Sequence, residues 1–323
     1  MEKALNKFTG EEALENTLKN LLSEEERREF WEAIKKLCTK EINLLIVGGT
    51  GVGKSSTINA LFETRGGGKV SEVGTSSKPQ TMEIQKYELD TLKIWDSPGL
   101  GDGDEQDRHH AEKIIELLQK KDEQGNALID LVLVILDGSS RDLGTSYRLI
   151  NEVIIPNLSE EDRKRVLIAM NKIDLVNPRE FDYTENKPSD KLMQRLDENA
   201  LIIQERIKRD TSVDVDVIYY CSGAEDEDGK QPPYNLSKLL FYISDHTPEE
   251  KRLVYAAHQN ESEQNFRDSD ERRNYNADTE EGFFKTLVKF GGKVVVKVLE
   301  NIPVVGTVVK VFKAGWDWLK SWW

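Results

Sequence analysis

The residues that decide the fold stand at positions 48–55 and read GGTGVGKS. An apolar run over 42–47 precedes them and a helix-forming run over 56–62 follows, which predicts a strand, a glycine-rich loop and a helix. Because glycine lacks a Cβ atom, the backbone N–H groups of such a loop can converge on one guest, and the start of the helix adds the positive end of its dipole. The stretch is therefore a P-loop, and a polyphosphate is the ligand that it predicts.

Two side chains of the P-loop carry the expected phosphate chemistry. Lys54 is placed to reach the β- and γ-phosphates as a point charge, and the Ser55 hydroxyl is placed to ligate the accompanying Mg²⁺. We therefore expect Mg²⁺ as the cofactor of a bound nucleoside triphosphate.

The base is predicted from residues 171–174, NKID, which follow a buried-strand pattern over 166–170. The carboxylate of Asp174 can accept hydrogen bonds from both the N1–H and the 2-amino group of guanine, whereas adenine offers neither donor. Asn171 is expected to brace the P-loop and the base edge, and the aliphatic stem of Lys172 to lie over the purine. The tetrapeptide therefore predicts GTP and GDP as ligands, and rejection of ATP.

A γ-phosphate sensor is predicted at residues 92–99, LKIWDSPG. This strand delivers Asp96 to its carboxyl end, where the carboxylate can hold Mg²⁺ through a water. The Gly99 N–H can bond the γ-phosphate only while that phosphate is present, so GTP orders the loop that follows. Thr81, before a strand expected over 82–89, is the candidate that closes over Mg²⁺ and the γ-phosphate, with Thr75 as the alternative.

The guanine O6 is expected to meet backbone N–H groups after the strand in residues 217–224, VIYYCSGA, and Ser222 and Gly223 are the predicted pair. The predicted nucleotide contacts are Gly49, Thr50, Gly51, Val52, Gly53, Lys54, Ser55, Ser56, Thr81, Asp96, Gly99, Asn171, Lys172, Asp174, Ser222 and Gly223. The predicted Mg²⁺ ligands are Ser55, Thr81 and Asp96, and the predicted catalytic residues are Lys54, Thr81 and Gly99.

With these motifs the chain resembles the translation-factor-related GTPases, in particular the Era-like group and its bacterial YfjP-type branch, often labelled 50S-ribosome-binding GTPases. The resemblance covers about residues 42–253 and extends to DGSSRDL at 137–143 and NPRE at 177–180. It implies an α/β fold with a doubly wound, mostly parallel sheet, whose nucleotide contacts all lie on loops at the carboxyl ends of the strands.

Hydrolysis is expected to be slow. Ras-type switches place a glutamine directly after the sensor glycine to orient the attacking water, and this chain has Leu100 there. Self-association through the G domain or a partner could supply the role. His109 and His110 are expected to be solvated, with water positioning as the alternative. A GTP-binding adaptor that does not hydrolyse GTP, and a ribosome-assembly GTPase, also stay open.

Composition narrows the partners of this 323-residue chain. A net charge of −14 argues against broad nucleic-acid affinity. The two cysteines, Cys38 and Cys221, stand at no metal-ligand spacing and are expected to be reduced thiols. Because the start of the sequence shows no apolar secretion signal, a cytoplasmic protein is expected, with a peripheral position at a membrane as the alternative.

Four regions are predicted along the chain: an N-terminal helical segment over 1–40, a G domain over 41–248, a charged linker over 249–281 and an amphipathic helical tail over 282–323. In the first region, helices are expected over 11–20 and 23–37. Ser23 and Glu26 form a capping box for the second helix, whose apolar face is expected to pack beside the first strand or to bind a partner.

The tail is predicted to be a helical hairpin. Lysines at every fourth position over 285–297 place a basic face on the first helix, and the sequence NIP at 301–303 breaks it before a second amphipathic segment. Seven lysines stand against two acidic residues from position 283 onward, and the segment ends in tryptophans. The pattern suits an anionic membrane surface or a protein partner, and a hairpin folded back on the G domain is the equal alternative.

Overall fold

The computed structural model describes residues 16, 18–64, 68–71, 84–99, 103–226 and 229–301. Its centre is a six-stranded sheet in the order β2-β3-β1-β4-β5-β8, in which β2 runs antiparallel to β3 and all other neighbours are parallel. The strands are β1 (Ile42–Gly48), β2 (Gln85–Leu89), β3 (Leu92–Asp96), β4 (Leu131–Asp137), β5 (Val166–Asn171) and β8 (Asp216–Tyr219). The predicted α/β fold with a mostly parallel sheet is confirmed.

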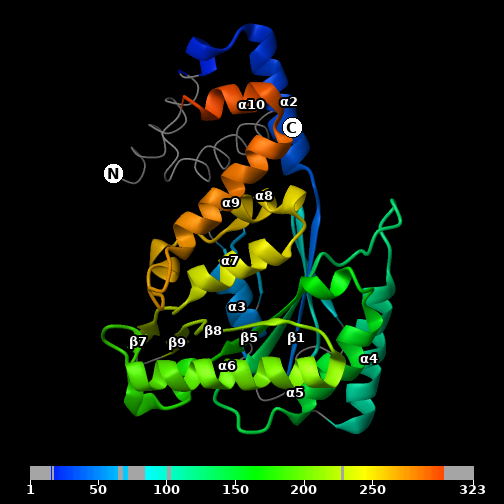
Figure 1. The fold of residues 1–323 in the computed structure, drawn as a ribbon, viewed down its shortest axis with the longest axis vertical. Coiled ribbons are helices and arrows are strands. Elements are labelled where there is room, and N and C mark those ends of the chain that lie inside the picture. Colours follow the sequence, from blue (N-terminus) through cyan, green and yellow to red (C-terminus); the bar gives the residue numbers. More distant parts are fainter. Residues whose placement is uncertain are drawn as a thin grey trace.

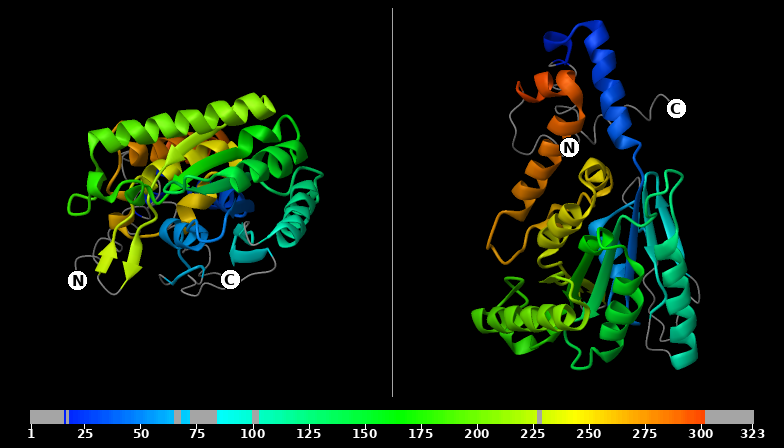
Figure 2. Two further views of the ribbon diagram at one scale, coloured as in Figure 1. Left: turned by 90° about the horizontal axis from the view of Figure 1, so that it is seen from below. Right: turned by 45° about the vertical axis from the view of Figure 1, so that its right-hand side comes forward.

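Helices cover both faces of the sheet (Figures 1 and 2). Successive side chains of β1 point to opposite faces, so Leu44 and Ile46 pack into one core and Leu45 and Val47 into the other. The first core contains α3 (Lys54–Leu61), α7 (Leu236–His246), α8 (Leu253–His258), α9 (Tyr275–Phe290), α10 (Gly292–Leu299) and α2 (Glu24–Cys38). The second contains α4 (Asp104–Gln119), α5 (Gly144–Arg148), the π-helix η1 (Leu149–Ile154) and α6 (Asp190–Thr211).

Short elements connect these layers. Two hairpins pair β6 (Phe181–Asp182) with β7 (Lys187–Pro188), and β9 (Ala224–Asp226) with β10 (Gly229–Gln231). The 3₁₀ turns are η2 (Ile155–Asn157), η3 (Asp162–Arg165), η4 (Ile173–Leu175), η5 (Pro178–Glu180), η6 (Glu249–Lys251) and η7 (Glu263–Phe266).

The helix α2 begins with the predicted capping box. The Glu26 N–H donates to the Ser23 hydroxyl at 3.2 Å, and the Ser23 N–H donates to the Glu26 carboxylate at 2.8 Å. Its buried apolar face packs against α8 and α10, at one end of the elongated molecule (Figure 1). The C-terminal part of the same chain therefore covers this face of α2.

Residues 249–281 are not a solvated linker, which corrects the prediction from composition. They form η6, α8, η7 and the start of α9, and they bury Leu253, Val254, Tyr255, Phe266 and Tyr275 in or beside the core. The apolar residues of this stretch are few, but nearly all of them face inward, so a low average hydrophobicity misrepresents the packing.

Many polar side chains of the same stretch bind protein groups. The Asn260 side chain donates to the carbonyl of Asn59 at 3.1 Å, and the Asn265 side chain donates to the carbonyl of Ala60 at 3.0 Å. These carbonyls lie in the last turn of α3, where a helix leaves acceptors unpaired. The C-terminal segment therefore caps the helix that starts at the P-loop.

A buried ion pair ties the segment to α7. The Lys238 ammonium lies 2.7 Å from the Asp270 carboxylate, and the Tyr275 hydroxyl donates to the other Asp270 oxygen at 3.0 Å. Asn235, at the start of α7, accepts from the Asp270 N–H at 2.8 Å and donates to the carbonyl of Tyr219 at 3.1 Å. Through Asn235, residues 268–275 are thus linked to Tyr219, the last residue of β8, where the following loop begins.

The predicted single helix over 283–299 is also wrong, because two helices meet at Gly291 and Gly292. Gly292 has a φ of +77°, in the left-handed region that glycine adopts without strain and that ends a helix. The apolar residues Phe283, Leu287, Val295 and Val298 are buried. For residues 283–299 the structure therefore shows the fold-back arrangement.

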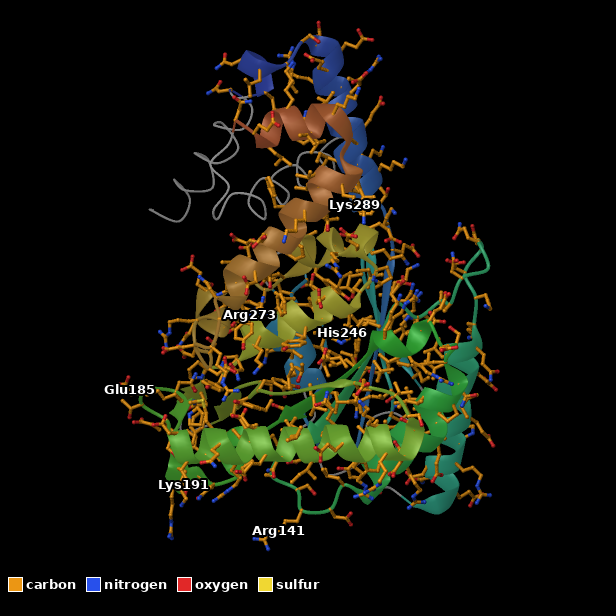
Figure 3. All side chains as sticks on the ribbon, in the orientation of Figure 1. Arg141, Glu185, Lys191, His246, Arg273 and Lys289 are labelled. Atoms are coloured by element: carbon orange, nitrogen blue, oxygen red, sulfur yellow. The ribbon has the colours of Figure 1, made fainter. Side chains whose placement is uncertain are left out.

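Three of the four lysines over 285–297 contact acidic side chains of the same chain. Figure 3 shows Lys289 near the end of α9, far from Arg141 in the loop after β4. The pairs are Lys285 with Glu281 at 2.7 Å, Lys289 with Glu249 at 2.5 Å and Lys297 with Glu26 at 2.8 Å. Residues 302–323, with the second predicted amphipathic segment, lie outside the described residues. Within the described ranges, no helix has the length and apolar character needed to cross a membrane.

Candidate functional site

The P-loop connects the carboxyl end of β1 to α3, as predicted. Gly51 and Gly53 have φ values of +74° and +94°, so glycine is required at both turns. A Cβ atom on Gly53 would collide with the Asn171 side chain, which shows how closely the two loops approach. The Lys54 ammonium bends back over the loop and donates to the carbonyls of Gly48 and Gly49, both at 3.2 Å. Phosphate oxygens are stronger acceptors for the same ammonium.

Asp96 ends β3 beside the P-loop and is 8% exposed. Its Oδ1 atom is buried without a hydrogen-bond partner in the part of the chain that the structure describes. Burial raises the pKa of Asp96 to about 6, although the Lys54 charge opposes the shift. A buried carboxylate oxygen with unused acceptor capacity fits a cation or its bound water, and Ser55 stands in the first turn of α3. These two residues would hold Mg²⁺.

The predicted sensor glycine lies directly against the P-loop. A Cβ atom on Gly99 would meet the backbone nitrogen of Thr50 at 2.6 Å, so the chain can pass here only as glycine. Its backbone is therefore positioned at the loop that would hold the γ-phosphate. Thr81, Thr75 and Leu100 lie outside the described residues.

Asn171 joins the phosphate end of the site to the base end. Its side-chain NH₂ donates to the carbonyl of Val52 at 2.9 Å and to the Ser222 hydroxyl at 3.2 Å, and its Oδ1 accepts from the Ser222 N–H at 2.9 Å. The side chain is 1% exposed. The P-loop, the end of β5 and the loop after β8 are thus held together by one buried amide.

The two other side chains predicted to read the base also have protein partners. Lys172 takes a left-handed φ of +59°, and its ammonium lies 2.8 Å from the Asp137 carboxylate at the end of β4. Asp174 is partly exposed, and its Oδ1 accepts a hydrogen bond from the Cys221 thiol at 3.1 Å. The partners Asp137 and Cys221 were not among the predicted site residues, because their contacts join segments that are far apart in the sequence.

The loop after β8 brings Ser222, one of the two residues predicted to bind the guanine O6, into hydrogen-bond contact with Asn171. The Ser222 N–H donates to Asn171 Oδ1, and the Gly223 N–H hydrogen-bonds the Cys221 sulfur. Gly223 has a φ of +78°, and a Cβ there would lie 2.7 Å from the carbonyl oxygen of Gln231. Glycine in this position is therefore a requirement of the backbone.

His109 and His110 differ in their surroundings. His109 is exposed on α4, whereas His110 is 2% exposed and faces the second core together with Ile114. Neither ring nitrogen of His110 has a hydrogen-bond partner among the described residues. The expectation that both are solvated is wrong for His110.

Comparison with known proteins agrees with this geometry. Residues 43–172 match a protein family described as "50S ribosome-binding GTPase". The match contains β1, the P-loop, Asp96 and the start of the base-reading motif. This part of the chain is therefore similar to the members of that family.

Among curated proteins, a stretch of 129 residues is 33% identical to "Translocase of chloroplast 108, chloroplastic" from Physcomitrium patens. The match covers 38% of this chain and 12% of that protein, so the chain spans about an eighth of its relative.

Solved structures with a similar fold include Toc33 from Arabidopsis thaliana in complex with Mg²⁺ and GMPPNP, at 16% identity and a TM-score of 0.43 over 69% of this chain and 90% of that chain. Another is Era from Aquifex aeolicus bound to GDP and AlF₄⁻, at 18% identity and a TM-score of 0.40 over 65% and 57% of the two chains. At these scores neither likeness supports a further conclusion.

Proposed function

We propose that the chain is a Mg²⁺-dependent guanine-nucleotide switch that slowly hydrolyses GTP to GDP. The observation that carries the proposal is the buried Asn171 amide, which bonds both the P-loop and the loop after β8. It supports the proposal because it joins the loop of the predicted phosphate contacts to the loop of the predicted base contacts. A nucleotide is the class of ligand that has both a phosphate chain and a base.

Each end of the site has a defined chemical task in this proposal. At the base end, Asp174 accepts from the two guanine donors, while Asp137 holds the ammonium of Lys172 so that its stem lies over the purine. At the phosphate end, Lys54 exchanges its two backbone carbonyls for phosphate oxygens. Ser55 and Asp96 are the described residues that would hold Mg²⁺, which would supply positive charge against the phosphates.

Slow hydrolysis follows from the residue after the sensor glycine. Leu100 cannot orient a water molecule, so we expect the isolated protein to turn over on the order of 10⁻³ s⁻¹ or more slowly. A second copy that meets the first through the G domain, or a protein partner, would supply the missing group. Turnover should then rise with protein concentration.

Base specificity is tested by competition between unlabelled nucleotides and fluorescent GDP. Wild type should bind GDP at least about 100-fold more tightly than ADP, because ADP leaves the Asp174 carboxylate without donors. Asp174→Asn should weaken GDP binding and favour xanthosine diphosphate, whose 2-oxo group accepts from an amide. Equal affinity of the wild type for ADP and GDP would refute the proposal.

Hydrolysis is tested in single-turnover assays with radiolabelled GTP at several protein concentrations. Lys54→Ala should abolish tight GTP binding while leaving the melting temperature of the nucleotide-free protein nearly unchanged. If the wild type binds GTP but shows no turnover at any concentration, the protein is the GTP-binding adaptor instead. Nucleotide-dependent co-sedimentation with 50S subunits would support the ribosome-assembly alternative.

We limit the docking proposal for the tail to residues after Asn301. The lysines at 285, 289 and 297 meet acidic groups of the protein, so they support a membrane role less than the pattern in the sequence suggests. Co-sedimentation with anionic vesicles, in GDP and in a slowly hydrolysed GTP analogue, tests the remaining segment. If the protein does not bind the vesicles at any salt concentration in either nucleotide state, the membrane proposal is wrong.

A further inference from the structure

Cys221 lies directly behind the carboxylate that is proposed to read guanine. Its thiol donates to Asp174 Oδ1 at 3.1 Å, and the side chain is 5% exposed. Its backbone is fixed by a two-way bridge with Tyr234, in which each N–H donates to the other residue's carbonyl at 2.9 Å. The thiol is therefore held in place by the fold and does not depend on a flexible loop.

The Asp174 carboxylate needs a fixed orientation to recognise guanine. The torsion that rotates a carboxylate is broad, so an unrestrained Asp samples planes in which only one oxygen faces the base. Within the described part of the chain, no second side chain donates to the Asp174 carboxylate, and Tyr183 reaches only the Asp174 backbone carbonyl, at 3.4 Å. The thiol is thus placed to define the plane of this group.

The thiol and the base do not compete for the same lone pairs. A carboxylate offers about four acceptor sites on two oxygens, and guanine uses one site on each. Burial, and next the Asp174 charge, hold the pKa of Cys221 far above its usual range, so the thiol keeps its proton. A protonated thiol is a donor that tolerates a bound base in front of the same carboxylate.

We propose that Cys221 is a specificity-determining positioning residue, whose thiol fixes the plane of the Asp174 carboxylate so that both oxygens meet the two donors of guanine. The inference rests on the proposed function, because it assigns a role within guanine recognition. It adds that the preference for a 2-amino group depends on a residue that does not touch the base.

The test compares GDP with inosine diphosphate, which keeps the N1–H of guanine but lacks the 2-amino group. The ratio of the two affinities reports how well Asp174 engages both donors. In Cys221→Ala this ratio should fall about three- to tenfold, the effect of losing one hydrogen bond. Cys221→Ser keeps a donor of shorter reach and should retain most of the ratio.

Two controls separate positioning from folding. Cys38→Ala changes the other cysteine of the chain and should leave the ratio unchanged. In an Asp174→Ala background, adding Cys221→Ala should change neither affinity, because the group that the thiol acts through is gone. Thermal unfolding of each variant shows whether it is folded.

The outcomes distinguish this inference from the proposed function. If the wild type prefers GDP and inosine diphosphate to ADP but Cys221→Ala leaves their ratio unchanged, the inference fails and guanine recognition stands. The same holds if the Cys221 and Asp174 effects add. If the wild type does not prefer GDP to ADP, the proposed function fails, and the inference fails with it.

Discussion

The proposed nucleotide-binding edge, formed by the P-loop and the loops after β3, β5 and β8, and the C-terminal segment over 249–299 are built on different principles. At the edge, polar groups such as Asn171 and Lys54 form a few specific hydrogen bonds to backbone groups of the P-loop. In the C-terminal segment, apolar side chains such as Tyr255 and Phe283 fill the core between α7, α2 and the sheet. Substitutions at the edge should therefore change affinity, and substitutions in the segment should change stability.

The two regions also meet. Asn59 of α3 accepts at its backbone carbonyl from Asn260, while its own side chain donates to the carbonyl of Ser71 at 2.7 Å. Its Oδ1 accepts from the Val70 and Ser71 N–H groups, both at 2.8 Å. The last turn of the P-loop helix therefore contacts both the C-terminal segment and the chain that leads toward the predicted threonine switch.

The largest expected effect comes from deletion of residues 249–323. It removes the buried apolar side chains of this segment, six of which by burial alone correspond to about 10 kcal/mol or more and match the whole stability of a typical domain. We expect aggregated or unfolded protein, measured by soluble yield and thermal unfolding. The six are Leu253, Val254, Tyr255, Phe266, Phe283 and Leu287.

Deletion of residues 302–323 is the matched control and should give soluble protein that binds GDP. If deletion from 249 also gave a stable domain with normal GDP affinity, the segment would be an accessory and the comparison would fail.

The next largest effect is expected for Phe283→Ala. Phe283 is fully buried, so truncation should lower the free energy of unfolding by about 3–5 kcal/mol. Phe290→Ala changes the same residue type on the same helix where it is 38% exposed, and should cost less than about 1 kcal/mol. Urea unfolding measures both, and equal losses would contradict the packing described for α9.

A substitution at the edge should instead raise stability. Because burial raises the pKa of Asp96, its ionised form destabilises the fold at pH 8 in the absence of metal. Asp96→Asn should increase the free energy of unfolding by about 1–3 kcal/mol in EDTA, while Mg²⁺ no longer strengthens GTP binding. Asp214→Asn, at an exposed position, is the control. Destabilisation by Asp96→Asn would show that the carboxylate serves the fold.

The smallest effect is expected at the other end of the sheet, where His246 of α7 lies 3.1 Å from Asp216 (Figure 3). Burial lowers the pKa of His246, but the bonds to Asp216 and to the Tyr242 carbonyl outweigh it and raise the pKa above 6.5. The resulting stability is complete below pH 6.5 and is lost as the pH rises through the raised value.

His246→Gln should thus cost up to about 1 kcal/mol at pH 6 and less at pH 8.5, since Asp216 is half exposed. His246 and Asp216 line a pocket that also contains charged side chains, and these are unchanged in His246→Gln. They are Asp245, Arg252, Lys164 and Arg165. Urea unfolding at the two pH values measures the difference. His109→Gln, at an exposed site, is the control and should show no such difference between the two pH values. A loss of stability in His246→Gln that grows with pH would contradict the pairing of His246 with Asp216.

The sequence by itself determined the proposed nucleotide-binding edge, because the residues that form it are close together in each motif. A P-loop needs glycine at Gly51 and Gly53 for local backbone reasons, and its strand and helix follow in the chain. The order of the motifs then predicted which strand ends meet, since parallel strands share one carboxyl edge. The capping box of α2 was likewise predicted from neighbouring residues.

Only the tertiary structure decided the rest, because it depends on contacts between distant segments. Composition indicated a linker over 249–281, but burial is determined by where Phe266 and Tyr255 point, and an average over a window does not contain that direction. The pairing of Cys221 with Asp174 spans 47 positions, and that of Asn260 with Asn59 spans 201. Such pairs form because the sheet and α7 bring these segments together, which no local pattern specifies.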